Sequence, residues 1–209
     1  MLVALAVASA PPARAALACP ASRPDVVVTP KLADPVIDNT LPQPALQKLA
    51  GKAYHGGRTL GLYRAELRAQ WPISFGMRDA DGETCRWIDG VVVEILAPER
   101  RIFIVRARPP GTCWYDSVLA HERKHQATDA AVVAEYAPRL EREIARAISA
   151  LPAGALVPVG QAAAAQRRLV APVQAAIKHV LDALDAARRA RQAAIDTPQE
   201  YRRVAAACG

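Results

Sequence analysis

Two histidines and a glutamate near the middle of the chain have the types and spacing of a metal site. His121, Glu122 and His125 form a His-Glu-x-x-His motif. On a helix, residues four apart lie about 40° apart around the axis and roughly 6 Å along it, so both imidazoles can reach one zinc ion. Glu122 can then point at a water molecule beside the metal and act as general base. The motif therefore predicts a hydrolytic zinc site.

The alternative is a solvated polar stripe on a surface helix, which the charged neighbours Arg123 and Lys124 would fit. The context favours the metal site, because apolar residues 118–120 lead into the motif and Asp116 before them can cap a helix. The chain has two other histidines. His55, in a turn over residues 54–59, either approaches the metal or is simply exposed, and His179 lies in the C-terminal third.

The stretch over residues 118–125 resembles the zincin metallopeptidases, in which both motif histidines bind zinc and the glutamate activates water. Matched residue by residue, this implies His121 and His125 as ligands and Glu122 as base. The run Tyr-Asp-x-x-Leu-x-His-Glu-x-x-His is similar to small bacterial secreted zinc-dependent protease families. The specific match covers about residues 113–129. It implies zinc as cofactor and a peptide or protein as substrate.

The third ligand does not follow the better-known zincin patterns. A metzincin would continue with Gly and a third His, whereas Gln-Ala-Thr-Asp occupies residues 126–129. A gluzincin would use a glutamate on the next helix, and we expect Glu141 or Glu143 in that role. Asp129 lies about 12 Å along the axis from His121 on a straight helix, so it would more readily hold a ligand imidazole by a hydrogen bond. The less favoured ligand candidates are Glu135, Asp129 and His179.

The first fifteen residues predict an exported protein. Residues 1–10 are almost wholly apolar, and Ala13-Arg14-Ala15 fits a small-x-small cleavage pattern, so we interpret residues 1–15 as a signal peptide. The apolar run is shorter than the roughly 20 residues of a membrane span. The alternatives are a buried N-terminal strand and a lipoprotein anchored through Cys19. The expected location is the periplasm or the outside of the cell.

The four cysteines agree with export. Cys19, Cys85, Cys113 and Cys208 form no Cys-x-x-Cys pair, which favours disulfides over a cysteine-built zinc site. Residues 91–97 and 101–107 both have the pattern of strands, with a turn at residues 98–100 between them. Cys85 and Cys113 are equidistant from Glu99, so a hairpin would bring them together. We therefore predict Cys85–Cys113, with Cys19–Cys208 joining the chain ends; the alternative is free buried thiols.

The remaining elements follow from periodicity, prolines and caps. Strands are expected at residues 25–29 and 73–77, with a turn at 79–82. Helices are expected at 44–50, 60–70, from about 116 onwards, 161–170 and 172–194, with Pro138 either kinking the motif helix or opening a second one. Thr197-Pro198-Gln199-Glu200 is a capping box that opens a last short helix.

These elements predict an α+β fold, mostly helical, with a small antiparallel sheet or hairpin beside the motif helix. The expected divisions are the signal peptide (1–15), a Pro-rich extended arm (16–50), a zincin-like region (51–151) and a helical extension packed on it (152–209). The net charge of +7 comes from arginines spread along the chain, which argues against dedicated nucleic-acid binding. An edge strand could hold an extended peptide beside the metal. The rival function is a non-enzymatic exported binding or scaffold protein, for example a degenerate zincin.

Overall fold

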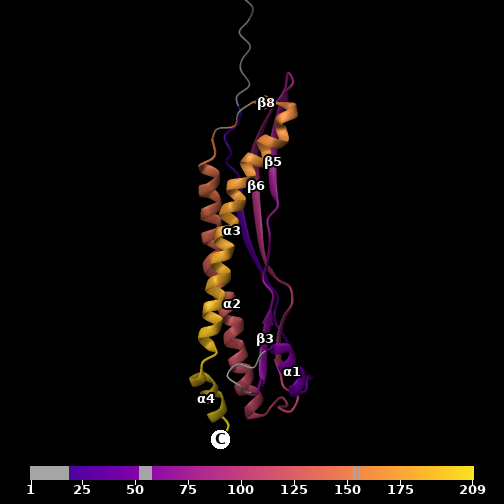
Figure 1. Ribbon diagram of the computed structural model, residues 1–209, viewed down its shortest axis with the longest axis vertical. Coiled ribbons are helices and arrows are strands. Elements are labelled where there is room, and N and C mark those ends of the chain that lie inside the picture. Colours follow the sequence, from indigo (N-terminus) through magenta and orange to yellow (C-terminus); the bar gives the residue numbers. More distant parts are fainter. Residues whose placement is uncertain (1–18, 52–57, 153, 155) are drawn as a thin grey trace, which may run out of the picture.

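The computed structural model describes residues 19–51, 58–152, 154 and 156–209. The expected signal peptide and His55 lie outside these residues. The described chain is an elongated α+β structure in which two long helices run beside strands along the long axis (Figure 1). The expected α+β class is therefore confirmed, although the sheets are mixed and not antiparallel throughout.

The two long helices are α2 (Cys113–Ser149) and α3 (Ala162–Ile195). With 37 residues, α2 is about 55 Å long. The Thr112 side chain caps α2 by accepting a hydrogen bond from the backbone N–H of Tyr115 (3.3 Å), so the helix begins slightly before the expected start. Each helix contains an internal proline and continues through it, Pro138 in α2 and Pro172 in α3. The two helices expected over residues 161–194 are therefore one.

The main sheet is built around β6 (Glu83–Ala97), the longest described strand. β1 (Asp25–Leu32) runs parallel to its second half, and β5 (Ile73–Ala80) runs antiparallel to its first half. Two short strands, β4 (Arg68–Gln70) and β8 (Val157–Pro158), also pair with β6. The strands expected at residues 25–29 and 73–77 are confirmed within β1 and β5.

A second, small sheet has the strand order β2-β7-β3 in the described part of the chain. Its strands are β2 (Val36–Asp38), β7 (Arg100–Ile104) and β3 (Gly61–Ala65). β2 is parallel to β7, whereas β3 is antiparallel to it. The segment expected as a surface arm thus contributes one strand to each sheet, and the expected helix near its end is α1 (Gln43–Ala50).

The hairpin expected between residues 91–97 and 101–107 is wrong, because β6 and β7 belong to different sheets. The tight reversal lies earlier in the chain. Asp81 and Gly82 both have positive φ (52° and 80°), as in the two-residue turns that suit a hairpin, and they join β5 to β6. The expected turn over residues 79–82 is therefore the true hairpin turn.

The helix expected over residues 60–70 is also wrong, because this segment forms β3 and β4. Leu60, Tyr63 and Leu67 suggested a helical period. The same segment alternates strictly from Tyr63 onwards, and every second side chain, from Arg64 to Gln70, is exposed. Alternation with period two is the pattern of a strand with one buried face.

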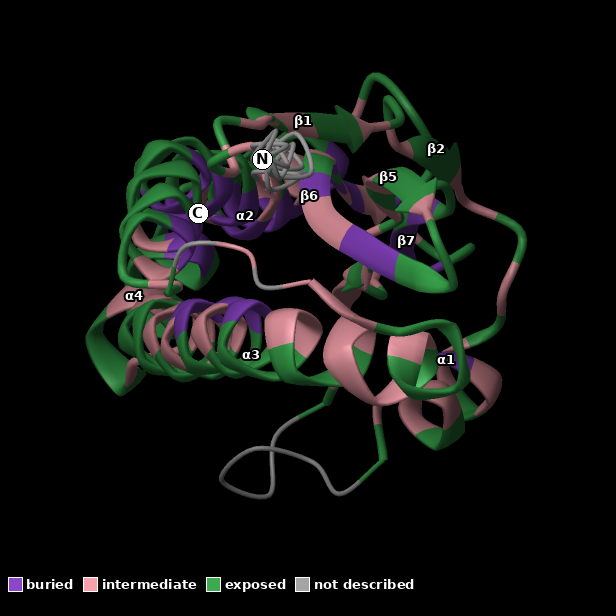
Figure 2. Cartoon of the chain, turned by 90° about the horizontal axis from the view of Figure 1, so that it is seen from above, coloured by how far each residue is buried: buried purple, intermediate pink, exposed green. Residues whose placement is uncertain are grey.

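The hydrophobic core lies between one face of the main sheet, α2 and α3. Viewed along the long axis, the buried residues of the two helices face the interior (Figure 2). The core is made mostly of valine, isoleucine and leucine: Ile88, Val91, Val93, Ile95, Val132, Leu140, Ile144, Ile148, Val173, Ile177, Val180 and Leu184. A smaller cluster under the small sheet joins Ile102 and Ile104 to Val118 of α2 and Val204 of α4 (Pro198–Ala206).

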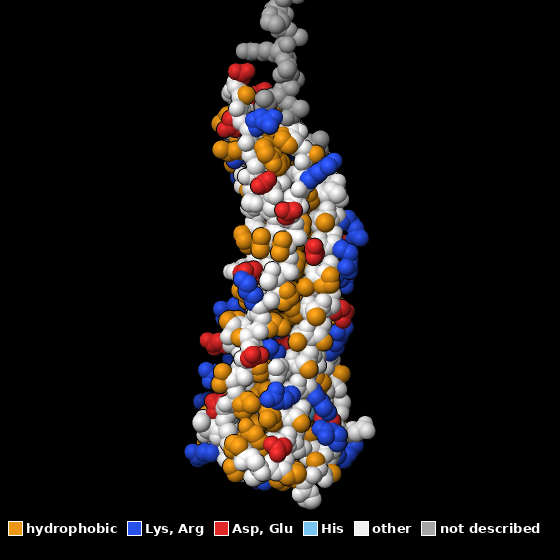
Figure 3. Space-filling model, turned by 180° about the vertical axis from the view of Figure 1, so that it is seen from behind, with side chains coloured by type: hydrophobic (Ala, Val, Ile, Leu, Met, Phe, Trp, Pro, Cys, Tyr) orange, Lys and Arg blue, Asp and Glu red, His pale blue; other side chains and the backbone are white. Residues whose placement is uncertain are grey.

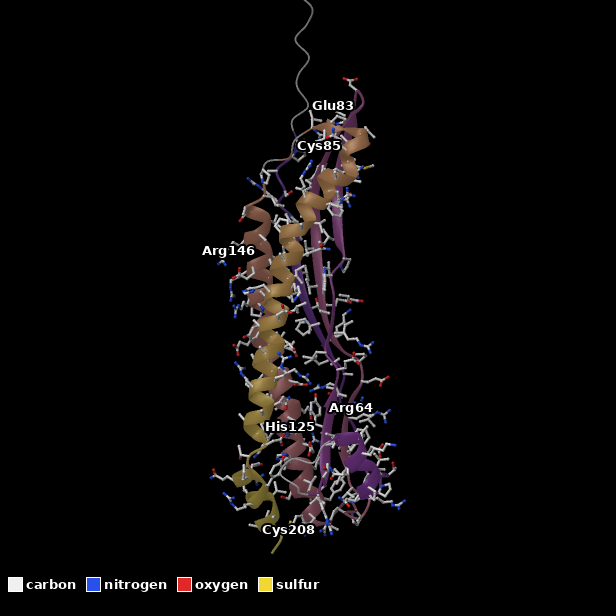
Figure 4. All side chains as sticks on the ribbon, viewed as in Figure 1. Arg64, Glu83, Cys85, His125, Arg146 and Cys208 are labelled. Atoms are coloured by element: carbon white, nitrogen blue, oxygen red, sulfur yellow. A yellow bond between two sulfur atoms is a disulfide. The ribbon has the colours of Figure 1, made fainter. Side chains whose placement is uncertain are left out.

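The disulfides are Cys19–Cys85 and Cys113–Cys208. Both expected pairings are therefore wrong, because they depended on a hairpin centred on Glu99 that does not form. Cys85 lies near one end of the molecule and Cys208 near the other (Figure 4). The alternative of free thiols is also excluded, since all four cysteines are paired. Cys19 is engaged in a disulfide, which argues against a lipid on its sulfur.

Two disulfides are typical of proteins from oxidising compartments and are consistent with export. Among the described residues, no helix has the length and hydrophobicity needed to span a membrane. On the face shown in Figure 3, basic side chains are spread along the molecule with acidic ones among them, rather than gathered in one block.

Candidate metal centre

The buried face of α2 changes from polar to apolar along its length. His121, Glu122, His125 and Asp129 are 6%, 5%, 8% and 1% exposed. The same face continues with apolar residues, among them Val132, Tyr136 and Leu140. The interpretation of the motif as a solvated stripe is therefore wrong. Burying four ionisable groups together is costly unless each has a partner, and the structure supplies these partners.

Asp196 completes a compact triangle with the two motif histidines. Its Oδ1 atom lies 3.2 Å from Nε2 of His125 and 3.3 Å from Nε2 of His121. The two Nε2 atoms lie 3.3 Å from each other. Around a tetrahedral zinc ion with ligands at about 2.0–2.1 Å, neighbouring ligand atoms are about 3.3–3.4 Å apart. The three atoms thus have the spacing of one face of such a tetrahedron and could hold a metal ion.

The turn between α3 and α4 positions Asp196. α3 ends at Ile195, and Thr197 caps α4 by accepting a hydrogen bond from the backbone N–H of Glu200 (3.1 Å), as the capping box predicted. Asp196 lies between these two helix ends. The Tyr201 hydroxyl, one turn into α4, donates a hydrogen bond to Asp196 Oδ1 (2.9 Å). The C-terminal segment, which was expected to pack on the motif helix and offered His179 as a ligand candidate, therefore contributes Asp196 to the triangle.

The candidates expected for the third ligand lie elsewhere. Because α2 continues unbroken through Pro138, Glu141 is about 24 Å along the axis from His125 and is exposed. Glu143 pairs with Arg146 at 2.6 Å, close to its own position on α2. The remaining two surface candidates are also remote: Glu135 pairs with Arg191, and His179 is exposed on α3.

His121 is supported from outside the triangle by Glu200. Its Nδ1 atom lies 3.3 Å from Oε1 of Glu200. The same carboxylate accepts hydrogen bonds from Lys124 and from Arg203, whose Nε and Nη2 atoms lie 2.8 and 2.7 Å away. Hydrogen bonds from Arg203, followed by those from Lys124 and His121, hold the pKa of Glu200 well below its usual range, so this carboxylate is ionised.

His125 is supported by Gln192 on α3. The Gln192 carbonyl oxygen contacts Nδ1 of His125, and the Gln192 amide nitrogen donates to the His125 carbonyl oxygen (2.9 Å) and to Asp129 Oδ1 (2.6 Å). Asp129 also accepts hydrogen bonds from Arg188 (2.7 and 3.1 Å) and from the Tyr63 hydroxyl (3.0 Å). Asp129 is thus not a member of the triangle and reaches His125 only through Gln192.

Charge in the triangle is balanced between the acid and the two imidazoles. Burial alone would raise the pKa of Asp196, but hydrogen bonds with His121 and His125 hold it well below its usual range. Burial alone would lower the pKa of each histidine, but the hydrogen bond with Asp196 acts together with the charge of Glu122 and with a second hydrogen bond, from Glu200 for His121 and from Gln192 for His125, so that the pKa of both is raised. Such a set of groups, an ionised acid with two basic imidazoles, has the donor chemistry of a divalent-metal site.

Glu122 lies on the same buried face but outside the triangle. Burial raises its pKa to about 7, although the two histidines and a backbone hydrogen bond from Tyr63 act in the opposite direction. β3 approaches Glu122 closely at Gly61, where an added Cβ would lie 2.5 Å from Glu122 Oε1 and 2.5 Å from Val118 Cγ1. Only glycine therefore fits at this point of β3 without displacing its neighbours.

The motif opens onto a cleft of about 880 Å³. Its walls come from the α2 face that carries His121, Glu122 and His125, from residues 60–63 at the start of β3, and from the α3–α4 turn. Near the N-terminal end of α2 the lining is apolar, with Trp114 and Val118. In Figure 4, His125 lies between the two long helices and the small sheet, in the half of the molecule that contains Cys208.

No protein-family model matches the chain, and neither curated proteins nor solved structures gave a match. The function must therefore be argued from the residues and their geometry. The sequence alone indicated His121, Glu122 and His125, but it gave no sign of Asp196 or Gln192, which stand in an Ala/Arg-rich helix and at its end. Glu200 could be recognised in the sequence only as part of the capping box, and not as a partner of His121.

Proposed function

We propose that the protein is an exported zinc-dependent peptidase. His121, His125 and Asp196 would hold the zinc ion, and Glu122 would be the general base. The observation that carries this proposal is the triangle of ligand atoms 3.2–3.3 Å apart, built from a buried His-Glu-x-x-His motif and a carboxylate 71 residues away. The resemblance of residues 113–129 to zincins supports the same assignment.

Zinc at this position would supply Lewis-acid chemistry, polarising a substrate carbonyl and acidifying a water molecule. The chain's own contribution is the proton transfer. Glu122 lines the same cleft as the three ligands, and its pKa of about 7 lets it both accept a proton near neutral pH and release it again. Glu122 would take the proton of the attacking water and pass it to the leaving amine.

The cleft also suits an extended peptide. β3 is the edge strand of the small sheet on the side of the cleft, and residues 60–63 line it. Two backbone groups at this edge are already engaged, the Tyr63 N–H by Glu122 and the Ala65 carbonyl by Arg188 (3.2 Å). The Leu60 carbonyl is hydrogen-bonded to Val105 on the opposite side, so a substrate backbone would pair with β3 at Gly61, next to Glu122.

A second candidate is a non-enzymatic exported binding protein. It is favoured by the outer face of the main sheet, where the paired residues Val27 and Val92 are 48% and 41% exposed. Exposed apolar side chains on a sheet are found at sites of protein contact. This candidate needs neither the base nor the triangle, which allows one experiment to separate the two functions.

The test compares wild type with Glu122→Gln and His121→Ala. We expect one zinc per chain in wild type and in Glu122→Gln, and none in His121→Ala. An unfolded protein substrate should be cleaved by wild type, about 10²–10⁴-fold more slowly by Glu122→Gln, and not by His121→Ala. Equal, substoichiometric zinc in wild type and His121→Ala would overturn the metal site. Stoichiometric zinc without cleavage by wild type would favour the binding protein.

A further inference from the structure

Gln192 has one chemically allowed orientation. Its amide nitrogen lies 2.9 Å from the His125 carbonyl oxygen and 2.6 Å from Asp129 Oδ1, and both of these atoms can only accept hydrogen bonds. If the amide were turned over, its oxygen would face two other oxygens at these distances. The neighbouring groups therefore fix which end of the amide faces His125.

The orientation of Gln192 decides the protonation of His125. The amide end that faces Nδ1 of His125 is the carbonyl oxygen, which can only accept a hydrogen bond. Nδ1 must then carry a hydrogen. Asp196 Oδ1 lies 3.2 Å from Nε2 and also only accepts, so in the metal-free protein both nitrogens carry hydrogen, in agreement with the raised pKa of His125. When Nε2 gives up its hydrogen, Nδ1 keeps its own, and the Nε2 lone pair is directed at the point that it shares with His121 and Asp196.

Asp129 is held firmly enough to impose this orientation. It is 1% exposed, and its Oδ1 atom accepts from Arg188 as well as from Gln192. Its Oδ2 atom accepts from Arg188 and from the Tyr63 hydroxyl. Burial raises the pKa of Tyr63 to about 12, so the hydroxyl stays protonated and donates to Asp129. Arg100 in turn donates to the Tyr63 oxygen (2.9 Å), which links this cluster to β7.

We infer that Gln192 is a positioning residue, oriented by Asp129, that holds His125 in the tautomer required of a metal ligand. This role of Gln192 rests on the proposed function, because it serves the zinc site only if His125 is a zinc ligand. In the metal-free protein Asp196 competes for the hydrogen of His125 at Nε2, so the effect of Gln192 on the tautomer is measured without metal in the Asp196→Ala background. His121 has a different support, the partly buried carboxylate of Glu200. The two histidines therefore respond to different substitutions.

The test uses Gln192→Met, which keeps the length of the side chain and removes both hydrogen-bonding ends. Gln192→Glu is its closest partner, because a protonated carboxyl group can donate to Asp129 Oδ1 through its hydroxyl and still accept from Nδ1 of His125 through its carbonyl oxygen. The nearby exposed Arg189 supplies the matched control, Arg189→Gln. Circular dichroism verifies that all three variants fold.

The first readout is the nitrogen NMR spectrum of the metal-free protein with labelled histidine, recorded at a pH where His125 is neutral. In the Asp196→Ala background, which removes the competing acceptor at Nε2, we expect hydrogen on Nδ1 of His125 with Gln192 intact, in Gln192→Glu and in Arg189→Gln, and a mixture of tautomers in Gln192→Met. The second readout is zinc affinity, which should fall about 10–100-fold in Gln192→Met and be unchanged in Arg189→Gln. In that background, hydrogen on Nε2 of His125 with Gln192 intact, or an unchanged tautomer in Gln192→Met, would overturn the inference. Absence of zinc binding by wild type with the expected tautomers would instead count against the proposed function.

Discussion

Oδ1 of Asp196 lies 3.2 Å from Nε2 of His125, although 71 residues separate the two in the chain. The distance is short because α3 runs back along α2 and ends beside the motif. α3 carries Gln192 to the outer nitrogen of His125, and the turn after it brings Asp196 to the inner one. One helix end thus supplies both a candidate ligand and its support.

Replacing Asp196 should show whether it is the third ligand, in place of the glutamates that the sequence suggested. Asp196→Ala removes one of the three proposed ligands, so we expect zinc affinity to fall by at least about 100-fold while the fold is kept. Glu141→Ala removes an exposed candidate far from the motif and should leave the affinity within about 2-fold of wild type, as expected for independent sites. Competition with a chromogenic zinc chelator measures both. A loss in Glu141→Ala with none in Asp196→Ala would contradict this assignment.

The motif could be predicted from the sequence because its geometry is local. His121, Glu122 and His125 lie within two turns of one helix, and helical spacing alone puts them on one face. The third ligand could not be predicted in this way. Its position depends on where α3 turns back relative to α2 and on an unbroken helix through Pro138, neither of which the spacing of residues records.

The strands were harder to predict where the apolar pattern fits both a helix and a strand. Residues 60–70 carry both a helical triplet of apolar residues and an alternating pattern, and pairing with β7 and β6 selects the strand. The hairpin error had a different cause. Both residues 79–82 and residues 98–100 have the pattern of a turn, but only the first joins two paired strands, and the predicted disulfide through Cys85 depended on the second. Interactions between distant segments thus decide both the strands at residues 60–70 and the position of the hairpin.

The two disulfides should affect metal binding unequally. Cys113–Cys208 ties α4 to the start of α2 near the site, whereas Cys19–Cys85 lies towards the opposite end. They span 95 and 66 residues, so the entropic stabilisation by each is similar, about 4–5 kcal/mol. A difference between them in zinc affinity therefore reports on the local support of Asp196.

We expect the Cys113→Ser/Cys208→Ser variant to bind zinc at least about 10-fold more weakly, because ordering the freed C-terminal segment adds to the cost of binding. The Cys19→Ser/Cys85→Ser variant should bind as wild type does, under conditions where both variants are folded. Isothermal titration with zinc measures both affinities. Equal losses in the two variants would show that the effect is global.

The stability of the metal-free protein should depend on Glu122 between pH 4.5 and about 7. Burial raises the pKa of Glu122 from 4.5 to about 7, so within this range the folded state holds a proton that the unfolded state has released. Ionising the buried group therefore lowers the free energy of unfolding as the pH rises, by up to about 3 kcal/mol in total. Glu122→Gln cannot ionise, so urea denaturation should show that it becomes more stable relative to wild type as the pH rises. Parallel profiles for the two proteins would contradict the raised pKa.

The close approach of β3 to the motif should make Gly61 critical for catalysis. In Gly61→Ala the new Cβ would meet Glu122 Oε1 and Val118 Cγ1 at 2.5 Å, so β3 or the Glu122 side chain must move. We expect cleavage to fall by at least about 10²-fold, because the base is misplaced, while zinc content is retained. Gly160→Ala is the matched control, since a Cβ there meets no atom within 4 Å. Stability measurements should show a cost of about 1–3 kcal/mol for Gly61→Ala. Full activity in Gly61→Ala would mean that this contact does not position the base.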